Sequence, residues 1–499
     1  MSERRADIAT SELVAVGLTA VAALALRVAG MGQSLFGDEL FTYADLAGRG
    51  VGGVVRHVAG GGVEDNPPLF YVLAELSSRL GAPEVWLRLP SVVLGTLTVP
   101  VLWLAGRLVA GPRAGLSAAA LWVLSPFVLF YGTEGRAYAT LAFFAALSTL
   151  ALLLALRTGR RRWWALYALA TCAALYSHYT AVFVLAAQAV WALAAHRGAW
   201  RPLVLATAAA ALAYLPWIPS LIEQGRDSSA QVIGAFYPLS LRSFGEGIAR
   251  PFCCHPYVQA ADLPGRDGLA LLVAGALVLD AAALRERGGR LTADRVLLVV
   301  LALATPAGLL AYSAVGTGIF APRNLTASIP AACLLAGWLL ARLPARAALA
   351  AGGLVAAGLL IGLVIGLGPS KQRPDLGAAA AIIDARAGAD DSYAETQLFF
   401  SDAPELRQGL RLHFDRRHPA VGVTFRREPD NRLRPVADRR AWLAVAAGKR
   451  LFVVGPRLPN LVGLPEPPPD LAARVRREQT RRFAGIFAID VAVWGPRRP

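Results

Sequence analysis

The chain has 499 residues, of which 56% are hydrophobic and 17% are charged, and its mean hydropathy is +0.48. Ordinary globular chains carry roughly 25% charged residues, so this composition excludes a typical soluble enzyme. The formal net charge of +16 suggests a nucleic-acid-binding protein, but such proteins gather their basic residues in one groove or stripe. Here many arginines stand at the ends of hydrophobic runs and most others in the C-terminal tail, so no nucleic-acid partner is predicted.

Hydrophobic runs long enough to cross a bilayer recur between residues 11 and 367. In lipid, backbone polar groups must be satisfied without water, so such runs form helices or closed barrels. Continuous Ala, Leu and Val without strict alternation favours helices. We therefore predict about eleven membrane-spanning helices, the first retained rather than cleaved as a signal peptide, near 11–31, 86–109, 114–131, 138–156, 163–177, 180–195, 201–219, 268–284, 295–313, 324–342 and 346–367.

The charges between these helices predict the orientation, because cytoplasmic loops of membrane proteins carry an excess of Lys and Arg. With a cytoplasmic MSERRAD segment, every second loop should be rich in arginine. This holds at each of those loops, which contain Arg107 and Arg113; Arg157, Arg160, Arg161 and Arg162; Arg197 and Arg201; Arg285, Arg287, Arg290 and Arg295; and Arg342 and Arg346. The short opposite loops contain chiefly Arg136 and Arg323. An odd number of helices then makes the C-terminal part extracytoplasmic, in a multi-pass protein of the cell membrane.

Two predicted external loops are long, about 32–85 and 220–267. In the first, the stretch from Pro68 to Leu80 is amphipathic and suits a helix in the membrane interface. After Gly368 the fractions of charge and proline rise. There LFVVGP and IFAIDVAVW predict strands, whereas PDLGAAAAIIDARAG and PELRQGLRLHF predict helices. We therefore predict a transmembrane domain over 1–368 and a small α/β extracytoplasmic domain over 369–499.

The four cysteines show neither metal-ligand spacing nor a disulfide framework. Cys172 and Cys333 fall in apolar helices, where a thiol acts as a small hydrophobe. Cys253 and Cys254 are adjacent in the second long loop, and the sequence assigns them no role. Arginine almost entirely replaces lysine, a composition typical of a GC-rich bacterial gene.

Ionisable residues gather at the predicted external ends of the helices, and ionisable groups at membrane depth indicate a functional site. Asp38 and Glu39 follow the first helix, and Glu64 and Asp65 stand in the same loop. Further polar residues stand at later external ends: Arg88, Glu134, Arg136, Tyr138, His178, Tyr179, Arg323 and Asn324. The cytoplasmic loops offer arginines but few carboxylates or histidines.

These residues lie in segments that resemble the GT-C polyprenyl-phosphate-sugar glycosyltransferases. The segments, in chain order, are GDELFTYAD, DNPPLFYVL, WLRLPSVVLGTL, SPFVLFYGTEGRAYAT and LYSHYTAVFVL. The resemblance covers roughly residues 30–200. It is nearest to family 39, which includes protein O-mannosyltransferases, aminoarabinose transferases and bacterial relatives of the RgtA/B/C/D type. It implies a GT-C membrane fold and transfer of a sugar from a polyprenyl-phosphate carrier to an external acceptor.

The resemblance also implies roles for individual residues. Asp38 would act as the base, because a carboxylate within hydrogen-bond reach can take the proton of an attacking hydroxyl. Glu39 and Asp65 would position the acceptor or tune Asp38. The leaving group is a lipid phosphate, which arginine forks stabilise best. Arg136 and Arg323 are the first candidates for binding it, followed by Arg88 and His178, with Glu134, Tyr138 and Tyr179 in the same group.

Structural explanations compete with these roles. Arg88 is equally consistent with a helix anchor whose side chain extends to the interface. Glu134 and Arg136 could form a structural ion pair, and His178 could serve only as a hydrogen-bonded residue of a helical hairpin. Some relatives carry histidine where this chain has Asn66, so the sequence predicts no cofactor and leaves a divalent metal ion open.

Two other functional classes compete with a glycosyltransferase. A transporter or flippase of a lipid-linked or polar solute predicts charges near helix centres and internal repeats. The sequence shows neither, because its charges cluster at helix ends and its two halves differ in loop length. A sensor or assembly scaffold would use the C-terminal domain for binding. The sequence does not identify the sugar, the oligomeric state or whether the acceptor is a lipid, a glycan or a protein.

Overall fold

The computed structural model describes residues 8–62, 65–226, 240–241, 244–245, 248–250, 265–285, 292–316, 318–396, 409–458 and 461–497. The chain divides into two compact units. The first comprises Met1–Gly32 and Asp45–Gly366, and the second comprises Gln33–Ala44 and Leu367–Pro499. The short segment after the first helix is therefore grouped with the C-terminal part of the chain.

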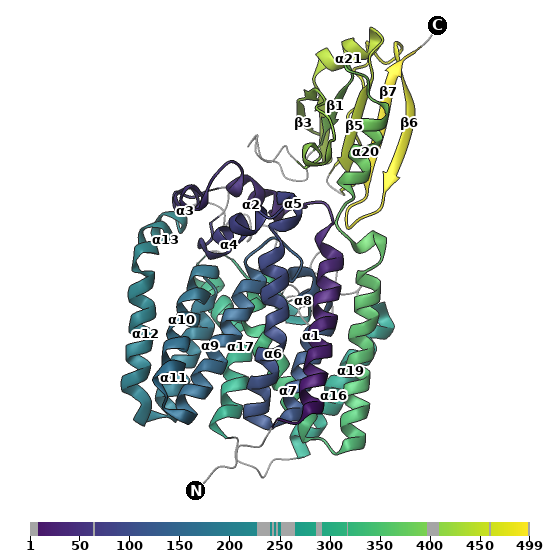
Figure 1. Ribbon diagram of the computed structural model, residues 1–499. Coiled ribbons are helices and arrows are strands. Elements are labelled where there is room, and N and C mark those ends of the chain that lie inside the picture. The colour runs from purple at the N-terminus through teal and green to yellow at the C-terminus, as the bar shows by residue number, and fades with distance from the viewer. Residues whose placement is uncertain are drawn as a thin grey trace. The chain divides into compact units, whose positions relative to one another are not determined.

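The first unit is a bundle of helices (Figure 1). All eleven hydrophobic segments predicted from the sequence are helical: α1 (Thr10–Met31), α6 (Leu89–Ala110), α7 (Pro112–Leu124) with α8 (Pro126–Tyr131), α9 (Tyr138–Thr158), α10 (Arg161–Ser177), α11 (Ala181–Ala195), α12 (Trp200–Tyr214) with α13 (Ile218–Gln224), α16 (Gly265–Arg285), α17 (Ala293–Val315), α18 (Ile329–Arg342) and α19 (Ala345–Gly366). Among the described residues, seven helical stretches are long and apolar enough to cross a membrane. The prediction of a helical, multi-pass membrane protein is confirmed.

Two of these segments contain a break with a clear local cause. Between α7 and α8 the chain turns at Ser125, whose hydroxyl accepts the backbone N–H of Val128 at 3.3 Å, and Pro126 begins the new helix. Proline is well suited to the first position of a helix, where its missing N–H needs no partner. The second break lies between α12 and α13, where Pro216 stands in a 3₁₀ turn (Leu215–Trp217) that joins the two helices.

Small residues allow α7 to pack closely against two neighbours. A Cβ atom added at Gly106 of α6 would lie 2.6 Å from the Cα of Gly115, and one added at Gly337 of α18 would lie 2.5 Å from the carbonyl oxygen of Ala114. Such close backbone approach is characteristic of helix pairs in membranes, where packing rather than water exclusion drives association. The centre of the bundle therefore depends on glycine and alanine.

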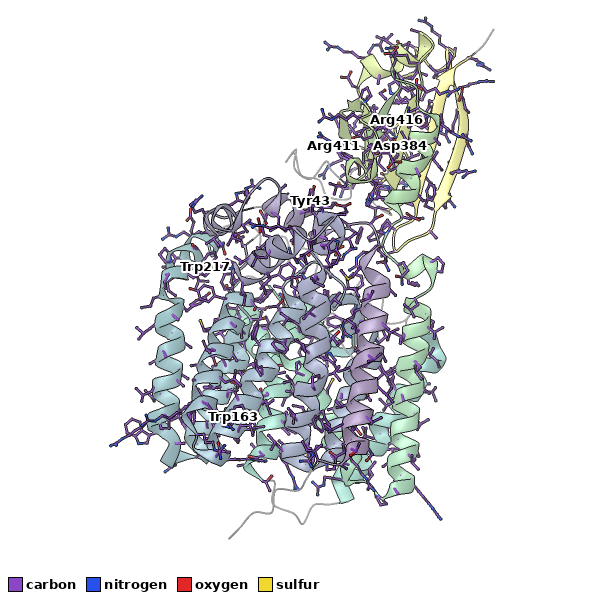
Figure 2. The ribbon with its side chains drawn as sticks, in the orientation of Figure 1. Tyr43, Trp163, Trp217, Asp384, Arg411 and Arg416 are labelled. Atoms are coloured by element: carbon purple, nitrogen blue, oxygen red, sulfur yellow. The ribbon has the colours of Figure 1, made fainter. Side chains whose placement is uncertain are left out.

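Trp163 and Trp217 mark opposite ends of this bundle (Figure 2). At the Trp163 end the arginines have local partners. The guanidinium of Arg162 lies over the Trp163 ring at 4.8 Å, and Arg157 Nη2 lies 2.5 Å from Asp294 Oδ2. Tryptophan and arginine are both favoured at membrane interfaces, where the ring or the alkyl chain stays in an apolar layer and the polar group reaches water.

Four short helices fill the first long loop: α2 (Asp38–Leu46), α3 (Val51–Ala59), α4 (Leu69–Ser78) and α5 (Pro83–Trp86). The predicted amphipathic helix corresponds to α4. Neither α2 nor α3 was predicted from the sequence. The stretch VGGVVRHVAGGG, which contains α3, is rich in glycine, and glycine is a poor helix former.

The second unit contains a five-stranded sheet in the order β2-β1-β5-β7-β6. Its strands are β1 (Ser392–Glu395), β2 (Ala420–Val421), β5 (Leu451–Pro456), β6 (Val475–Phe483) and β7 (Ile489–Pro496), and a separate hairpin consists of β3 (Val423–Arg427) and β4 (Leu433–Ala437). The strand β1 runs parallel to β2 and β5, whereas β7 is antiparallel to β5 and β6. The predicted small α/β domain with its two strands at LFVVGP and IFAIDVAVW is confirmed.

Both faces of this sheet are covered by a helix. Successive side chains of β5 point to opposite sides of the sheet and pack in two different cores. Phe452 and Val454 pack in one core with α20 (Leu376–Arg386), the helix predicted from PDLGAAAAIIDARAG. Leu451 and Val453 pack in a second core with α21 (Arg439–Ala446). Figure 1 shows α20 lying along the strands. The helix predicted from PELRQGLRLHF is wrong in its described part, which contains only a 3₁₀ turn (Arg411–His413), and residues 404–408 lie outside the described residues.

Candidate active site

Asp38 and Glu39 begin helix α2 and are held by a turn in the chain just before it. Gly37 has a φ of 60°, which favours glycine, and its carbonyl accepts the N–H of Leu40 at 3.0 Å. Glu39 caps the turn, because its Oε2 accepts the N–H of Phe36 at 3.3 Å while its own N–H donates to the Phe36 carbonyl at 3.2 Å. This reciprocal pattern fixes where the helix starts.

The two carboxylates differ in their surroundings. The Glu39 side chain is fully buried and its Oε2 also lies 3.0 Å from the Nε of Arg373. Asp38 is buried too, but it retains 8% of its surface. Both lie in the first turn of α2. Glu39 is therefore committed to a structural pair, and Asp38 is the more accessible of the two.

In the first unit, residues from three distant parts of the chain meet around His178. The Tyr138 ring lies 5.7 Å from the His178 ring, centre to centre, and 4.7 Å from the ring of Tyr131. Arg136 and Arg323 are close enough to act electrostatically on His178. These residues belong to the start of α9, the α10–α11 connection and the segment before α18. The structure thus brings together Arg136, Tyr138, His178 and Arg323.

The His178 imidazole is uncharged at neutral pH. Loss of hydration, with added repulsion from Arg136 and Arg323, lowers the pKa of His178 to about 3. Its Nδ1 accepts the N–H of Thr180 at 3.2 Å, which is the local hairpin bond expected from the structural explanation. His178 therefore has a local role and lies within electrostatic reach of Arg136 and Arg323, which carry the positive charge around it.

Tyr179 belongs to a second group of polar residues beside this cluster. Its hydroxyl donates to Gln224 Oε1 and accepts the indole N–H of Trp217 at 3.1 Å, and Gln224 Nε2 donates to the carbonyl of Val58 at 2.8 Å. Burial raises the pKa of Tyr179 to about 12, and the negative charge of Asp65 contributes in the same direction. Asp65 is thus near Tyr179. Since Trp217 marks one end of the bundle, the cluster lies at the end opposite Trp163 (Figure 2).

Arg88 and Glu134 are both buried. Arg88 has no exposed surface, and its Nη1 donates to the carbonyl of Met31 at 2.7 Å, which attaches the start of α6 to the end of α1. A fully buried guanidinium does not extend to the interface, so the anchoring explanation does not describe Arg88. Glu134 keeps 2% of its surface, and its carbonyl accepts the N–H of Arg136 at 2.7 Å.

Sequence reasoning missed two buried arginines. Arg27 lies within α1, where its Nη1 donates to the carbonyl of Ala23 at 3.0 Å and its Nε lies close to Gly95 and Gly132. An arginine inside an apolar run was the available signal. Arg373, the partner of Glu39, stands just after the last membrane helix and offered no signal, because its partner is far away in the sequence.

Some sequence predictions concern residues that the structure does not bring into one described site. Asp38 and Glu39 belong to the second unit, whereas Asp65, Arg88, Glu134, Arg136, Tyr138, His178, Tyr179 and Arg323 belong to the first. Glu64, Cys253, Cys254 and most of the predicted loop 220–267 lie outside the described residues. Within the part of the chain that the structure describes, no group of three His, Cys, Asp or Glu residues is placed to hold a metal ion. The functional roles of the site residues stay predictions.

Comparisons with known proteins agree with this architecture. Residues 65–222 match the family model described as dolichyl-phosphate-mannose-protein mannosyltransferase. The structure is similar to that of ArnT from Cupriavidus metallidurans bound to undecaprenyl phosphate, with a TM-score of 0.54, 15% sequence identity and coverage of 97% of this chain and 98% of that one. The same protein in its apo state gives a TM-score of 0.54 at 13% identity, with coverage of 96% and 97%. No curated protein sequence matches the chain.

Two other solved structures are similar to this chain at lower TM-scores. The oligosaccharyltransferase of Archaeoglobus fulgidus gives a TM-score of 0.48 at 13% identity, covering 81% of this chain and 63% of that one. The arabinosyltransferase EmbB of Mycobacterium smegmatis gives 0.43 at 15% identity, covering 69% and 32%. The similarity to ArnT and the seven candidate membrane spans among the described residues show a multi-pass membrane protein with the fold of the GT-C glycosyltransferases. Its closer family resemblance, over residues 65–222, is to the mannosyltransferases named above, so the resemblance predicted from the motifs is confirmed.

Proposed function

We propose that this chain is an inverting membrane glycosyltransferase that moves a sugar from a polyprenyl-phosphate carrier to an acceptor hydroxyl on the extracytoplasmic side of the membrane. The family match and the GT-C fold support a glycosyltransferase. A polyprenyl-phosphate donor is supported by the undecaprenyl phosphate bound to the ArnT structure. We infer that a transmembrane catalytic domain over 1–368 is joined to an extracytoplasmic domain over 369–499 that helps to select the acceptor.

The observation that carries this proposal is the arginine cluster, in which Arg136 and Arg323 both act on a neutral His178. A lipid phosphate that leaves with an additional negative charge needs fixed cationic donors, and in a site of low dielectric constant these are worth more than in water. A neutral imidazole adds no charge but supports the neighbouring Tyr138 ring. The arginines would thus stabilise the leaving group.

The reaction would be a single displacement. The acceptor oxygen forms a bond to the anomeric carbon while the bond from that carbon to the phosphate oxygen breaks, and the lipid phosphate leaves with the electron pair. The hydroxyl proton passes to the carboxylate of Asp38, the first residue of α2. Attack from the face opposite the leaving group inverts the configuration of the sugar.

The test is the variant Asp38→Asn in a transfer assay with purified protein in lipid nanodiscs. Loss of general base catalysis should lower kcat by about 10²–10⁴-fold. The control is Asp438→Asn, because Asp438 also begins a helix and its side chain accepts the N–H of Arg440 at 2.8 Å, a role that asparagine fills equally well. Wild-type kcat in a well-folded Asp38→Asn protein would refute the base assignment. Mass spectrometry of envelope glycans and glycoproteins, with and without the gene, would identify the sugar and the class of acceptor.

A further inference from the structure

The segment that carries Asp38 is held by residues more than 300 positions away in the sequence. Glu39 Oε2 and Arg373 Nε form an ion pair at 3.0 Å, in which the side chains keep 0% and 2% of their surface. Both residues belong to the second unit. An ion pair with this little exposure is screened only weakly, so replacing Arg373 removes a strong interaction of the buried Glu39 carboxylate.

Further contacts hold the residues just before Glu39. Ser34 Oγ accepts the N–H of Gly377 in the first turn of α20 at 3.1 Å, and Gln33 Oε1 accepts the backbone N–H of Arg373 at 3.3 Å. The Phe36 ring lies 5.8 Å from the ring of Phe487, centre to centre. Polar and aromatic contacts therefore reach this segment from two separate parts of the C-terminal chain, 372–377 and 487.

The ion pair and the helix start share one atom. Glu39 Oε2 accepts from Arg373 and also from the N–H of Phe36, which fixes the turn at Gly37. A displaced Glu39 carboxylate would therefore release the first turn of α2, in which Asp38 is the neighbouring residue. The guanidinium of Arg373 is in this way connected to the position of Asp38 through a single side chain.

We propose that Arg373 is a positioning residue for the reaction: through Glu39 it fixes the first turn of α2 and thereby the place of the Asp38 carboxylate. This inference rests on the proposed function for the role of Asp38. It gives the C-terminal part of the chain an indirect role in catalysis, because Arg373, which lies between α19 and α20, supports the position of the base.

The experiment compares Arg373→Gln, Arg373→Lys, Glu39→Gln and the double variant Glu39→Gln/Arg373→Gln in the full-length protein. Arg373→Gln should lower kcat by about 10²-fold, because a displacement of about 1 Å at a reacting group has an effect of that size, while KM for the donor stays within roughly threefold. Arg373→Lys should recover part of kcat. The double variant should lose no more activity than the worse single variant, since the two residues act as a unit.

A second measurement does not depend on turnover. Hydrogen–deuterium exchange should rise in residues 33–44 of Arg373→Gln and stay unchanged elsewhere in the second unit. The control is Arg416→Gln, since Arg416 donates to the backbone carbonyls of Asp384 and Ala387 in the same unit and touches no residue of 33–44 in its described contacts (Figure 2). This variant should leave kcat and the exchange of residues 33–44 unchanged.

The outcomes separate this inference from the proposed function. Wild-type kcat and unchanged exchange in Arg373→Gln would overturn the positioning role while glycosyl transfer by the wild-type protein stands. Exchange that rises equally throughout 367–497 would also overturn it, because Arg373 would then support the whole unit. Absence of transfer by the wild-type protein would overturn the proposed function and with it the catalytic role, whereas exchange would still decide whether Arg373 holds the segment.

Discussion

Asp38 and Glu39 show how two adjacent carboxylates acquire different tasks from their surroundings. Glu39 is enclosed and paired with Arg373, so its charge stabilises the structure. Asp38 retains some exposed surface at the same helix start. The sequence could not predict that Glu39 pairs with Arg373, because the two residues are separated by 334 positions. A contact of that range leaves no local pattern in the sequence.

Arg323 provides a prediction at the scale of one residue. If it binds the phosphate of the donor, Arg323→Gln should weaken the binding of undecaprenyl phosphate by about 10–100-fold, since a hydrogen bond to a charged group contributes about 1.5–3 kcal/mol. Native mass spectrometry of the protein in detergent would measure the affinity. The control is Arg342→Gln in the last turn of the same helical stretch, where Arg342 lies over the ring of Trp338. Equal affinities for both variants would contradict the assignment of Arg323.

At the scale of elements, the helices were more predictable than the strands. Each hydrophobic segment is helical because its backbone groups must be satisfied within lipid, and that requirement is local. Strand β6 was missed, because VRREQTRRF contains neither alternation nor an apolar run. It forms at the edge of the sheet by pairing with β7, and charged edge strands are common since they discourage further pairing.

The half-buried carboxyl group of Glu395, at the end of strand β1, affects the stability of the protein. Burial raises the pKa of Glu395 to about 7, although its oxygens accept the N–H of Leu410 at 3.2 and 3.4 Å. The pKa in the folded state thus exceeds the ordinary value of 4.5, so folding takes up a proton between these values. The free energy of unfolding loses this contribution as the pH rises from 4.5 through 7.

Glu395→Gln should therefore stabilise the protein above pH 7, because glutamine keeps the acceptor for Leu410 without the buried charge. The side chain is only half-buried, so we expect a gain of about 1–2 kcal/mol at pH 8 that disappears near pH 4.5. Thermal unfolding in detergent at both pH values would measure it. The exposed Glu466 serves as the control, since Glu466→Gln removes only a surface pair with Arg477 and should change little at either pH. A gain that is equal at the two pH values would contradict the role of the charge.

At the scale of the whole molecule, the chain order does not coincide with the compact units. Residues 33–44 are grouped with the C-terminal part, although they follow the first membrane helix directly. A division based on hydropathy assigns them to a membrane-domain loop, because composition changes sharply only near residue 368. The predicted domain boundary at residue 368 reflects a change in composition. The compact units reflect contacts between distant residues, such as those of Ser34 and Arg373.

The orientation of the molecule in the membrane is the last prediction. The cluster of Arg136, His178 and Arg323 belongs to the Trp217 end of the bundle, and the arginine-rich connection that contains Arg162 belongs to the Trp163 end (Figure 2). We therefore expect the Trp163 end to be cytoplasmic and the second unit extracytoplasmic. A cysteine at either of two exposed positions, Arg160→Cys or Lys449→Cys, would distinguish the two sides.

In spheroplasts, a membrane-impermeant maleimide should label Lys449→Cys at once and Arg160→Cys only after the membrane is opened by detergent. The unsubstituted chain is the control, because its four native cysteines give the background labelling by the maleimide in closed and in opened spheroplasts. The two substitutions exchange charged, exposed side chains, so neither should disturb insertion. Labelling of Arg160→Cys in closed spheroplasts would place the arginine-rich loops outside. The carboxylates and arginines proposed for transfer would then face the cytosol, and an extracytoplasmic acceptor would be impossible.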